Sequence, residues 1–193
     1  MGLFYILILM TEDDKKDVRA VLDFWFKETD PKQRFIKDPV FDARIKDRFG
    51  ELYWKLLDGL TTTWRETAEG RLAEIIILDQ FARNMFRDNA QSFMADPIAL
   101  QLARAAIEIG ADKEVPEEQR AFFYLPFMHS ESSEVHEEAL RIFTDFGNQG
   151  NLEYEIKHKN IIDRFGRYPH RNKILGREST PEELEFLKDN PGF

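Results

Sequence analysis

Apolar residues recur along most of the chain at the three- and four-residue spacing of an α-helix that buries one face. Between residues 11 and 27, Val18, Val21 and Trp25 follow this spacing, and acidic residues occupy the opening turn, where the helix dipole favours them. No stretch shows the strict alternation of apolar and polar residues that is typical of a half-buried strand. The pattern therefore predicts an all-α protein.

Start and stop signals divide this pattern into separate helices. Asp38 and Asp96 each precede a proline, as an N-cap precedes proline at the first helical position, and Thr180 opens a capping box. Glycines follow several of the apolar phases and are typical of helix ends. After the segment 11–27, these signals predict helices over residues 39–57, 71–86, 97–109, 117–128, 135–146, 152–165 and 181–187, with a loop over 87–95.

Short connections between consecutive helices predict antiparallel helix pairs, arranged either in a bundle or in a tetratricopeptide-like array. No internal repeat near 34 residues supports the array by itself. Two runs, Ile75–Leu78 and Ala121–Met128, are apolar on every side and predict helices enclosed by others. We expect the second, third and sixth elements of the chain to carry most of the core.

Length and composition favour one domain over residues 11–193, because 193 residues with 42% hydrophobic residues and no cysteine can be stabilised by packing alone. Residues 1–10, MGLFYILILM, are predicted to be an N-terminal extension, with either Met1 or Met10 as the start. Their eight-residue apolar run is too short to span a bilayer and lacks the flanks of a signal peptide. We expect a cytoplasmic protein with no membrane partner, and no oligomeric state is predicted.

Charge is unevenly distributed along the chain. The net charge is −9, yet residues 157–177 contain seven lysines and arginines and one acid, Asp163. A basic segment in an acidic protein requires an internal acidic partner or an external anion. The overall negative charge argues against nucleic acid as a partner.

Polar residues follow the C-terminal ends of three apolar helices, and we expect these three clusters to converge in space. Charges that buried helices carry into the interior are costly unless they find partners there. The candidate site residues are Asp79, Gln80, Arg83, Asn84, His129, Glu131, His158, Arg164, Arg167, His170, Arg171, Asn172 and Arg177.

One interpretation of these residues is structural. Asp79 and Glu131 would pair with Arg83, Arg171 and the other arginines of the set in a satisfied network that fixes how the helices dock. An interaction module of tetratricopeptide type is compatible with this interpretation. Such a module would bind a peptide on an exposed concave face and would not need buried polar groups.

A second interpretation is a site for a small anion. Arg83, Arg167, Arg171 and Arg177 outnumber the two acids that the same clusters supply. Arginine forks bind carboxylate and phosphate groups, so the sequence predicts a small anionic ligand that corrects the imbalance.

A third interpretation is a hydrolase-like or metal-dependent enzyme. A metal would draw on His129, Glu131, His158 and His170, but their spacing matches no metal-binding motif, so neither a metal nor a cofactor is predicted. Ser130 follows His129 directly, although adjacency in sequence does not place its hydroxyl on the imidazole.

The chain also resembles a known family over nearly its whole length. The segments that carry the resemblance are LDFWF (22–26), ILDQFARNMFR (77–87), FFYLPFMHSE (122–131), HKNIIDRFGRYPHRNKILGR (158–177) and STPEE (179–183). They are similar to the bacterial family of unknown function numbered nine-two-four. The resemblance implies an all-helical domain of the tetratricopeptide-like superfamily, with no established activity or cofactor, and it assigns no role to the candidate residues.

Overall fold

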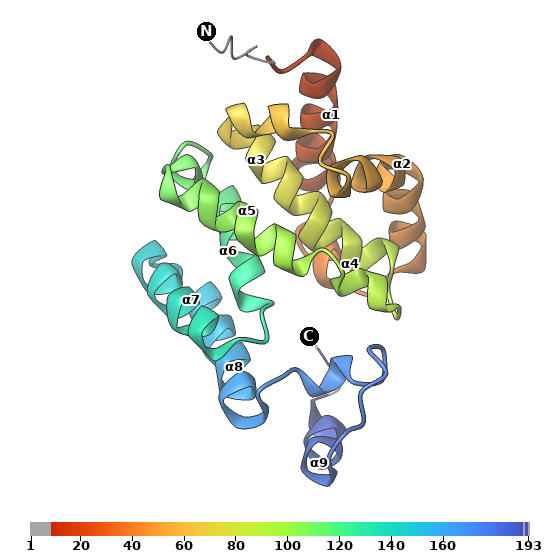
Figure 1. Cartoon of the computed structure of the whole chain (residues 1–193), viewed down its shortest axis with the longest axis vertical. Helices are drawn as coiled ribbons and strands as arrows, with labels where there is room; N and C mark the ends of the chain where they lie inside the picture. Colours follow the sequence, from red (N-terminus) through yellow and green to blue (C-terminus); the bar gives the residue numbers. More distant parts are fainter. Residues whose placement is uncertain (1–8, 191, 193) are drawn as a thin grey trace, which may run out of the picture.

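The structure, a computed structural model, describes residues 9–190 and 192, and every regular element in this part of the chain is helical (Figure 1). The all-α prediction is therefore confirmed. The predicted extension falls mainly on residues 1–8, which lie outside the described residues. The helices are α1 (Glu12–Asp23), α2 (Pro39–Leu57), α3 (Ala68–Ile75), α4 (Ala82–Met85), α5 (Asp96–Glu108), α6 (Glu117–Met128), α7 (Ser133–Phe146), α8 (Gln149–Phe165) and α9 (Pro181–Asp189).

Side-chain caps define several helix starts as the sequence predicts. The Asp38 carboxylate accepts hydrogen bonds from the first turn of α2, and Thr180 forms a capping box at the start of α9. The central helix begins three residues before its predicted start, because Thr67 caps it by accepting a hydrogen bond from the Gly70 amide. Glycine is required at position 70, since a Cβ atom there would lie 2.0 Å from the Trp64 carbonyl oxygen.

The central helix is continuous from α3 to α4, and a π-helical segment, Ile76–Phe81, lies in its middle. A second π-helical segment, Phe24–Glu28, extends α1. Segments of this kind widen the helix locally and are frequent at functional sites. The apolar run Ile75–Leu78 is fully buried, which confirms the prediction that other elements enclose this helix.

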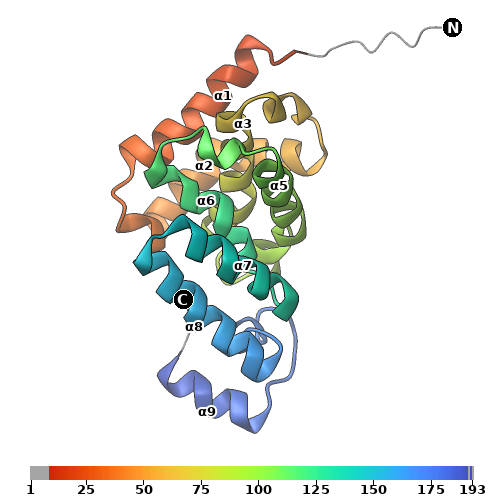
Figure 2. The ribbon, with the colours of Figure 1, turned by 90° about the vertical axis from the view of Figure 1, so that its left-hand side faces the viewer.

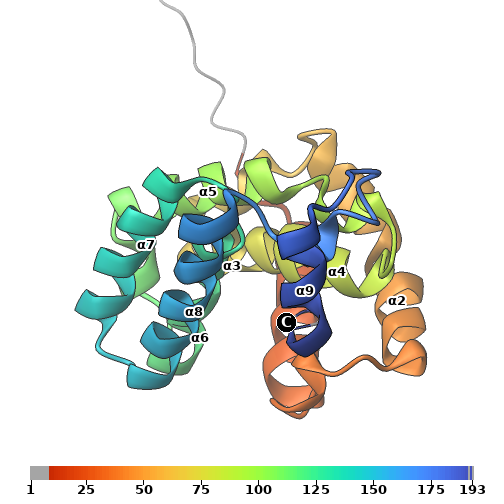
Figure 3. The same ribbon diagram turned by 90° about the horizontal axis from the view of Figure 1, so that it is seen from below.

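Helices α5 to α8 lie side by side and run alternately up and down, as Figures 1 and 2 show. The chain beyond α8 crosses to the side of α4, and Figure 3, seen from below, shows α9 in front of that part of the molecule. The turn begins at Gly166, which ends α8 in the left-handed conformation. The chain after Gly166 thereby reaches the start of α5 and the C-terminal end of α6, where Arg171 contacts Asp96 and His129. The tetratricopeptide-like description stays a prediction.

Two local predictions are wrong. Asp96 is not an N-cap: it is the first residue of α5, and its side chain makes no capping hydrogen bond. Tyr154, assigned by its spacing to the inner face of α8 with His158, is 57% exposed. The inward position of His158 is confirmed, since it is buried. Among the helices of residues 9–190, none is long and apolar enough to cross a membrane.

Candidate functional site

Asp79 is the most deeply buried of the candidate acids, with no exposed surface, and it lies in the π-helical segment. Its Oδ1 atom lies 2.7 Å from His129 Nδ1 and 3.2 Å from Arg83 Nη1, and its Oδ2 accepts a 2.6 Å hydrogen bond from Gln80 Nε2. Burial opposes ionisation, but Arg83 and His129 outweigh it and hold the pKa of Asp79 below its ordinary value. Asp79 is therefore an ionised carboxylate at neutral pH.

Asp96 bridges two arginines that come from different parts of the chain. Arg83 donates to both of its oxygens, at 2.9 and 3.0 Å, in a bidentate pair. Arg171 lies on the other side, with 3.3 Å between its Nη1 and Asp96 Oδ2. Asp96 does not cap α5 because its carboxylate binds these two guanidinium groups.

Arg171 is held between two aromatic rings at the lower end of the molecule. Its guanidinium carbon lies 4.4 Å from the centre of the Phe93 ring and 4.7 Å from that of Tyr168. Its Nη2 donates to the His129 carbonyl oxygen at 2.9 Å, whereas its Nε has no hydrogen-bond partner. Burial lowers the pKa of Arg171 from its ordinary value, and only 6% of the residue is exposed.

The imidazole of His129 contacts Asp79 through one nitrogen and has no hydrogen bond to its other nitrogen from any residue that the structure describes. Its Nδ1 faces the ionised Asp79, so Nδ1 carries the proton and Nε2 carries the lone pair. Burial and the nearby Arg83 charge lower the pKa of His129, which keeps the ring neutral. Nε2 makes no hydrogen bond to any described residue, and 16% of the side chain is exposed.

A groove of about 570 Å³ opens beside these groups. Its walls are mainly apolar, and His129, Asp96, Glu131 and Arg171 lie along them. The remaining lining residues are Ala90, Gln91, Phe93, Met94, Pro97, Leu100, Pro126, Ser130 and Leu175. An apolar cleft with a few convergent polar groups is the usual form of a small-molecule site.

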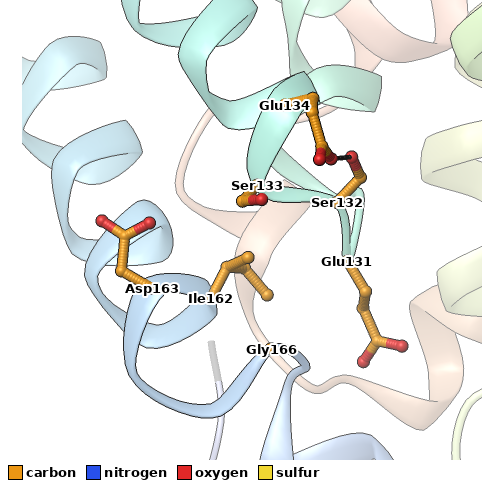
Figure 4. Close-up of a pocket in the computed structure, with 7 residues that line it drawn as sticks. All are labelled: Glu131, Ser132, Ser133, Glu134, Ile162, Asp163 and Gly166. Atoms are coloured by element: carbon orange, nitrogen blue, oxygen red, sulfur yellow. Dashed lines mark hydrogen bonds between the residues drawn. The ribbon is translucent and has the colours of Figure 1, made fainter.

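A second hollow, of about 530 Å³, lies between the start of α7 and the end of α8 (Figure 4). Glu131, Glu134 and Asp163 line it, together with Ser132, and Ser132 donates a 2.6 Å hydrogen bond to Glu134. No lysine, arginine or histidine is among its lining residues. This hollow is therefore unsuited to an anion.

Glu131 and Tyr168 fasten the returning chain to the end of α6. Glu131 forms a bidentate pair with Arg177, at 2.6 and 2.8 Å, and accepts a 2.7 Å hydrogen bond from the Tyr168 amide. Burial raises the pKa of Glu131, but Arg177 and that amide reverse the effect, so the net pKa is lowered. The Tyr168 hydroxyl donates to the Met128 carbonyl oxygen at 2.6 Å, which fixes the ring that Arg171 packs against.

The three predicted clusters thus converge at Asp79, Gln80, Arg83, His129, Glu131, Arg171 and Arg177. Other candidates have partners elsewhere. Asn84 donates to Asp42 at 2.8 Å, and Arg164 pairs with Glu182 on the exposed surface. Arg167 binds Glu183, and Asn172 donates to Ser179. Arg167 thereby holds α9 to the turn after α8, and Asn172 holds the segment just before α9.

His158 and His170 pack against the Tyr168 ring, with centroid distances of 5.8 and 5.5 Å. Burial lowers the pKa of His158 to about 3 and that of His170 to about 4. Both rings are therefore neutral at physiological pH and add no positive charge there. Neither residue lines the groove.

The predicted excess of arginine is wrong, because two acids were missing from the count. Asp96 shares Arg83 and Arg171, and Glu183, 2% exposed, pairs with Arg167. With these residues included, the acids of the clusters equal the arginines in number. The sequence did not indicate that either acid pairs with an arginine. Each lies in the first turn of a helix, where an acid ordinarily caps the helix or interacts with its dipole.

Sequence reasoning also missed a buried pair on α7 and α8. His136 Nδ1 lies 2.7 Å from Glu155 Oε1, and both side chains are fully buried. His136 Nε2 lies 2.9 Å from the Ser130 carbonyl oxygen and 3.1 Å from the Tyr168 hydroxyl. The pair supports the loop after α6 that carries His129. Across the described part of the chain, no three His, Asp or Glu side chains are grouped as a metal site.

Residues 21–191 match the model of a family described as bacterial proteins of unknown function, DUF924. The chain belongs to the DUF924 family. A solved structure of a protein of unknown function, ATU0120 from Agrobacterium tumefaciens, is similar to this DUF924 chain, with 39% identity and a TM-score of 0.87. The similarity covers 92% of this chain and 100% of that one. No protein with a curated description matches.

Proposed function

We propose that this DUF924 protein binds a small carboxylate with an apolar body in the groove beside Arg171 and His129. The observation that carries the proposal is the placement of Arg171 at one end of apolar walls. Its guanidinium shares the Asp96 carboxylate with Arg83, and Asp96 makes the shorter, bidentate contact with Arg83. Nη1 and Nη2 of Arg171 each carry a second N–H beyond the one bonded to Asp96 or to the His129 carbonyl, and a carboxylate in the groove would accept from these.

The walls support an apolar body on the ligand. Met94, Leu100, Pro126 and Leu175 line the groove on several sides. Each methylene group of a ligand that leaves water for such walls contributes about 0.8 kcal/mol. A straight-chain carboxylate should therefore bind more tightly as its chain lengthens, until it fills the groove.

The neutral His129 ring adds a dependence on pH. A carboxylate next to the Nε2 lone pair would favour protonation of the imidazole, which would then donate a hydrogen bond to the ligand. The charged groups packed around the ring are Asp79, Arg83, Asp96 and Arg171. We expect binding to be tighter at pH 6 than at pH 8.

The test is a thermal-shift series at pH 6 with acetate, butyrate, hexanoate, octanoate and benzoate at millimolar concentrations. Bound carboxylate should raise the melting temperature of the wild type by mass action, more for longer chains. Arg171→Met should lose the shift, as should Leu175→Trp, which fills the groove. Arg164→Met serves as the matched control, because Arg164 forms an exposed pair away from the groove. No shift with any carboxylate in the wild type would refute the proposal.

A peptide-binding module is the second candidate, and the exposure of two groove residues favours it. Met94 is 47% exposed and Leu175 is 36% exposed, so an apolar side chain from another protein would find a docking position between them. If the groove binds peptides in this way, the Arg171→Met variant should bind hydrophobic peptides as tightly as the wild type. The small-molecule proposal requires the opposite response.

A further inference from the structure

We propose that the protein hydrolyses small carboxylic esters in the groove with His129 as the general base. The carboxylate described above would be the product. This inference rests on the proposed function, because the ester and its carboxylate product share the groove. Its geometric basis is that His129 pairs with a buried acid through Nδ1, keeps 16% of its side chain exposed, and lines an apolar groove.

The Asp79–His129 pair has the geometry of a base and the group that orients it. The 2.7 Å contact between Asp79 Oδ1 and His129 Nδ1 holds the ring in one tautomer, and Gln80 and Arg83 hold the carboxylate in turn. The buried carboxylate also stabilises the imidazolium that forms when Nε2 takes a proton. A histidine that only filled space in the core would not need this second set of supports.

Arg171 supplies the second requirement, a donor for the carbonyl oxygen of the ester. Its Nη2 donates to the main-chain carbonyl of His129, so the guanidinium and the imidazole belong to one end of the groove. A positive group fixed before the reaction stabilises the negative charge that develops on the carbonyl oxygen. The two rings of Phe93 and Tyr168 keep the guanidinium in place.

Water is the nucleophile that fits the arrangement. Ser130 also lines the groove, but no hydrogen bond joins its Oγ to the His129 ring, and this Oγ accepts a 3.2 Å hydrogen bond from the Ser132 amide. The residues around the groove include no cysteine, since the chain contains none. The geometry therefore supports direct attack by a water molecule that His129 activates.

The reaction balances as ester plus water giving carboxylic acid plus alcohol. His129 Nε2 takes a proton from water as the water oxygen bonds to the acyl carbon, and the carbonyl electron pair moves to the oxygen that Arg171 faces. The tetrahedral intermediate then re-forms its C=O bond and releases the alkoxy group, which takes the proton back from Nε2. The acid loses its proton to solvent, and the carboxylate stays beside Arg171 until it dissociates.

The experiment measures hydrolysis of p-nitrophenyl acetate, butyrate and hexanoate by the full chain, together with the melting-temperature shift caused by hexanoate. His129→Gln should lower kcat by about 100-fold or more, the scale of a general base, while it keeps a hexanoate-induced shift. Arg164→Met is the control, because Arg164 forms an exposed pair away from the groove, and it should keep wild-type kcat. Circular dichroism establishes that both variants are folded.

Each outcome separates the two proposals. If hexanoate shifts the wild type but no ester is hydrolysed above the rate in buffer, the carboxylate site stands and the catalytic inference fails. Equal kcat in His129→Gln and wild type also overturns the inference, because hydrolysis then comes from other surface groups. If hexanoate causes no shift and esters are not hydrolysed, both proposals fail.

Discussion

His129 Nδ1 lies 2.7 Å from Asp79 Oδ1, a contact that joins the C-terminal end of α6 to the middle of the central helix, fifty positions away in the sequence. The contact determines the tautomer of His129 and leaves Nε2 as the nitrogen that can accept a proton, in a residue that lines the groove. The neutral ring also donates a hydrogen bond to a carboxylate whose charge would otherwise be costly in the interior. One pair of residues therefore affects both the stability of the fold and the chemistry of the groove.

Removing the Asp79 carboxylate should be strongly destabilising. Asp79→Ala leaves Arg83 with one acidic partner in place of two and removes the acceptor of His129 and Gln80. We expect a loss of about 3 to 5 kcal/mol in the free energy of unfolding, measured by urea denaturation. Asp163→Ala removes a 46% exposed carboxylate and leaves its partner Lys159 paired with Glu137, so it should cost less than about 1 kcal/mol. Similar losses in the two variants would show that Asp79 is not part of a buried network.

Asp96→Asn distinguishes a bridging carboxylate from a helix cap. Asparagine caps a helix about as well as aspartate, so the substitution would be nearly neutral at an N-cap. In the bridging position it removes the charge that Arg83 and Arg171 share, and we expect a loss of about 2 to 3 kcal/mol. Asp38→Asn, at a position that does cap a helix, should change stability by less than about 0.5 kcal/mol. Urea denaturation of both variants gives the comparison.

Stability should fall as the pH is lowered below neutrality, and His158 is one cause. Its pKa is about 3 in the folded protein and near 6.5 in the unfolded chain, so only the unfolded chain gains a proton as the pH falls between these values. Stability from this residue is therefore complete above pH 6.5 and is lost as the pH falls towards 3. From pH 7 to pH 5 the loss is about 2 kcal/mol.

The measurement is urea denaturation of the wild type and His158→Gln at pH 7 and pH 5. The variant has no proton to gain at this position, so its free energy of unfolding should change with pH by about 2 kcal/mol less than that of the wild type. The absolute stability of the variant does not enter the comparison. Equal changes with pH in the two proteins would show that His158 is protonated in the folded state.

Helix starts and the central position of the Ile75–Leu78 run could be predicted because they depend on local signals. A threonine or aspartate before a proline, or four apolar residues in succession, has a structural consequence within a few residues. The π-helical segment around Asp79 has no such local signal, and neither does the exposed position of Tyr154. Both depend on how distant helices pack.

The candidate site was predicted in part for the same reason. The sequence shows polar groups at the ends of buried helices, which predicts that these groups contact one another. His129 does contact both Asp79 and Arg171. The role of Asp96 could not be recognised, because an aspartate before a proline at a helix start has the sequence of a cap. The partners of an arginine are set by the folded chain, so a count of charges within sequence clusters gave a false excess.

The central claim, that the groove beside His129 and Arg171 binds a carboxylate, is tested most directly by nuclear magnetic resonance of the protein labelled with ¹⁵N in its histidines. In the free protein, His129 should be the neutral tautomer with the proton on Nδ1, as its contact with Asp79 requires. Adding hexanoate at pH 6 should shift the His129 Nε2 resonance towards that of the protonated ring and leave His136, which is fully buried, unchanged. Unchanged His129 resonances at millimolar hexanoate, or a proton on Nε2 in place of Nδ1, would contradict the account.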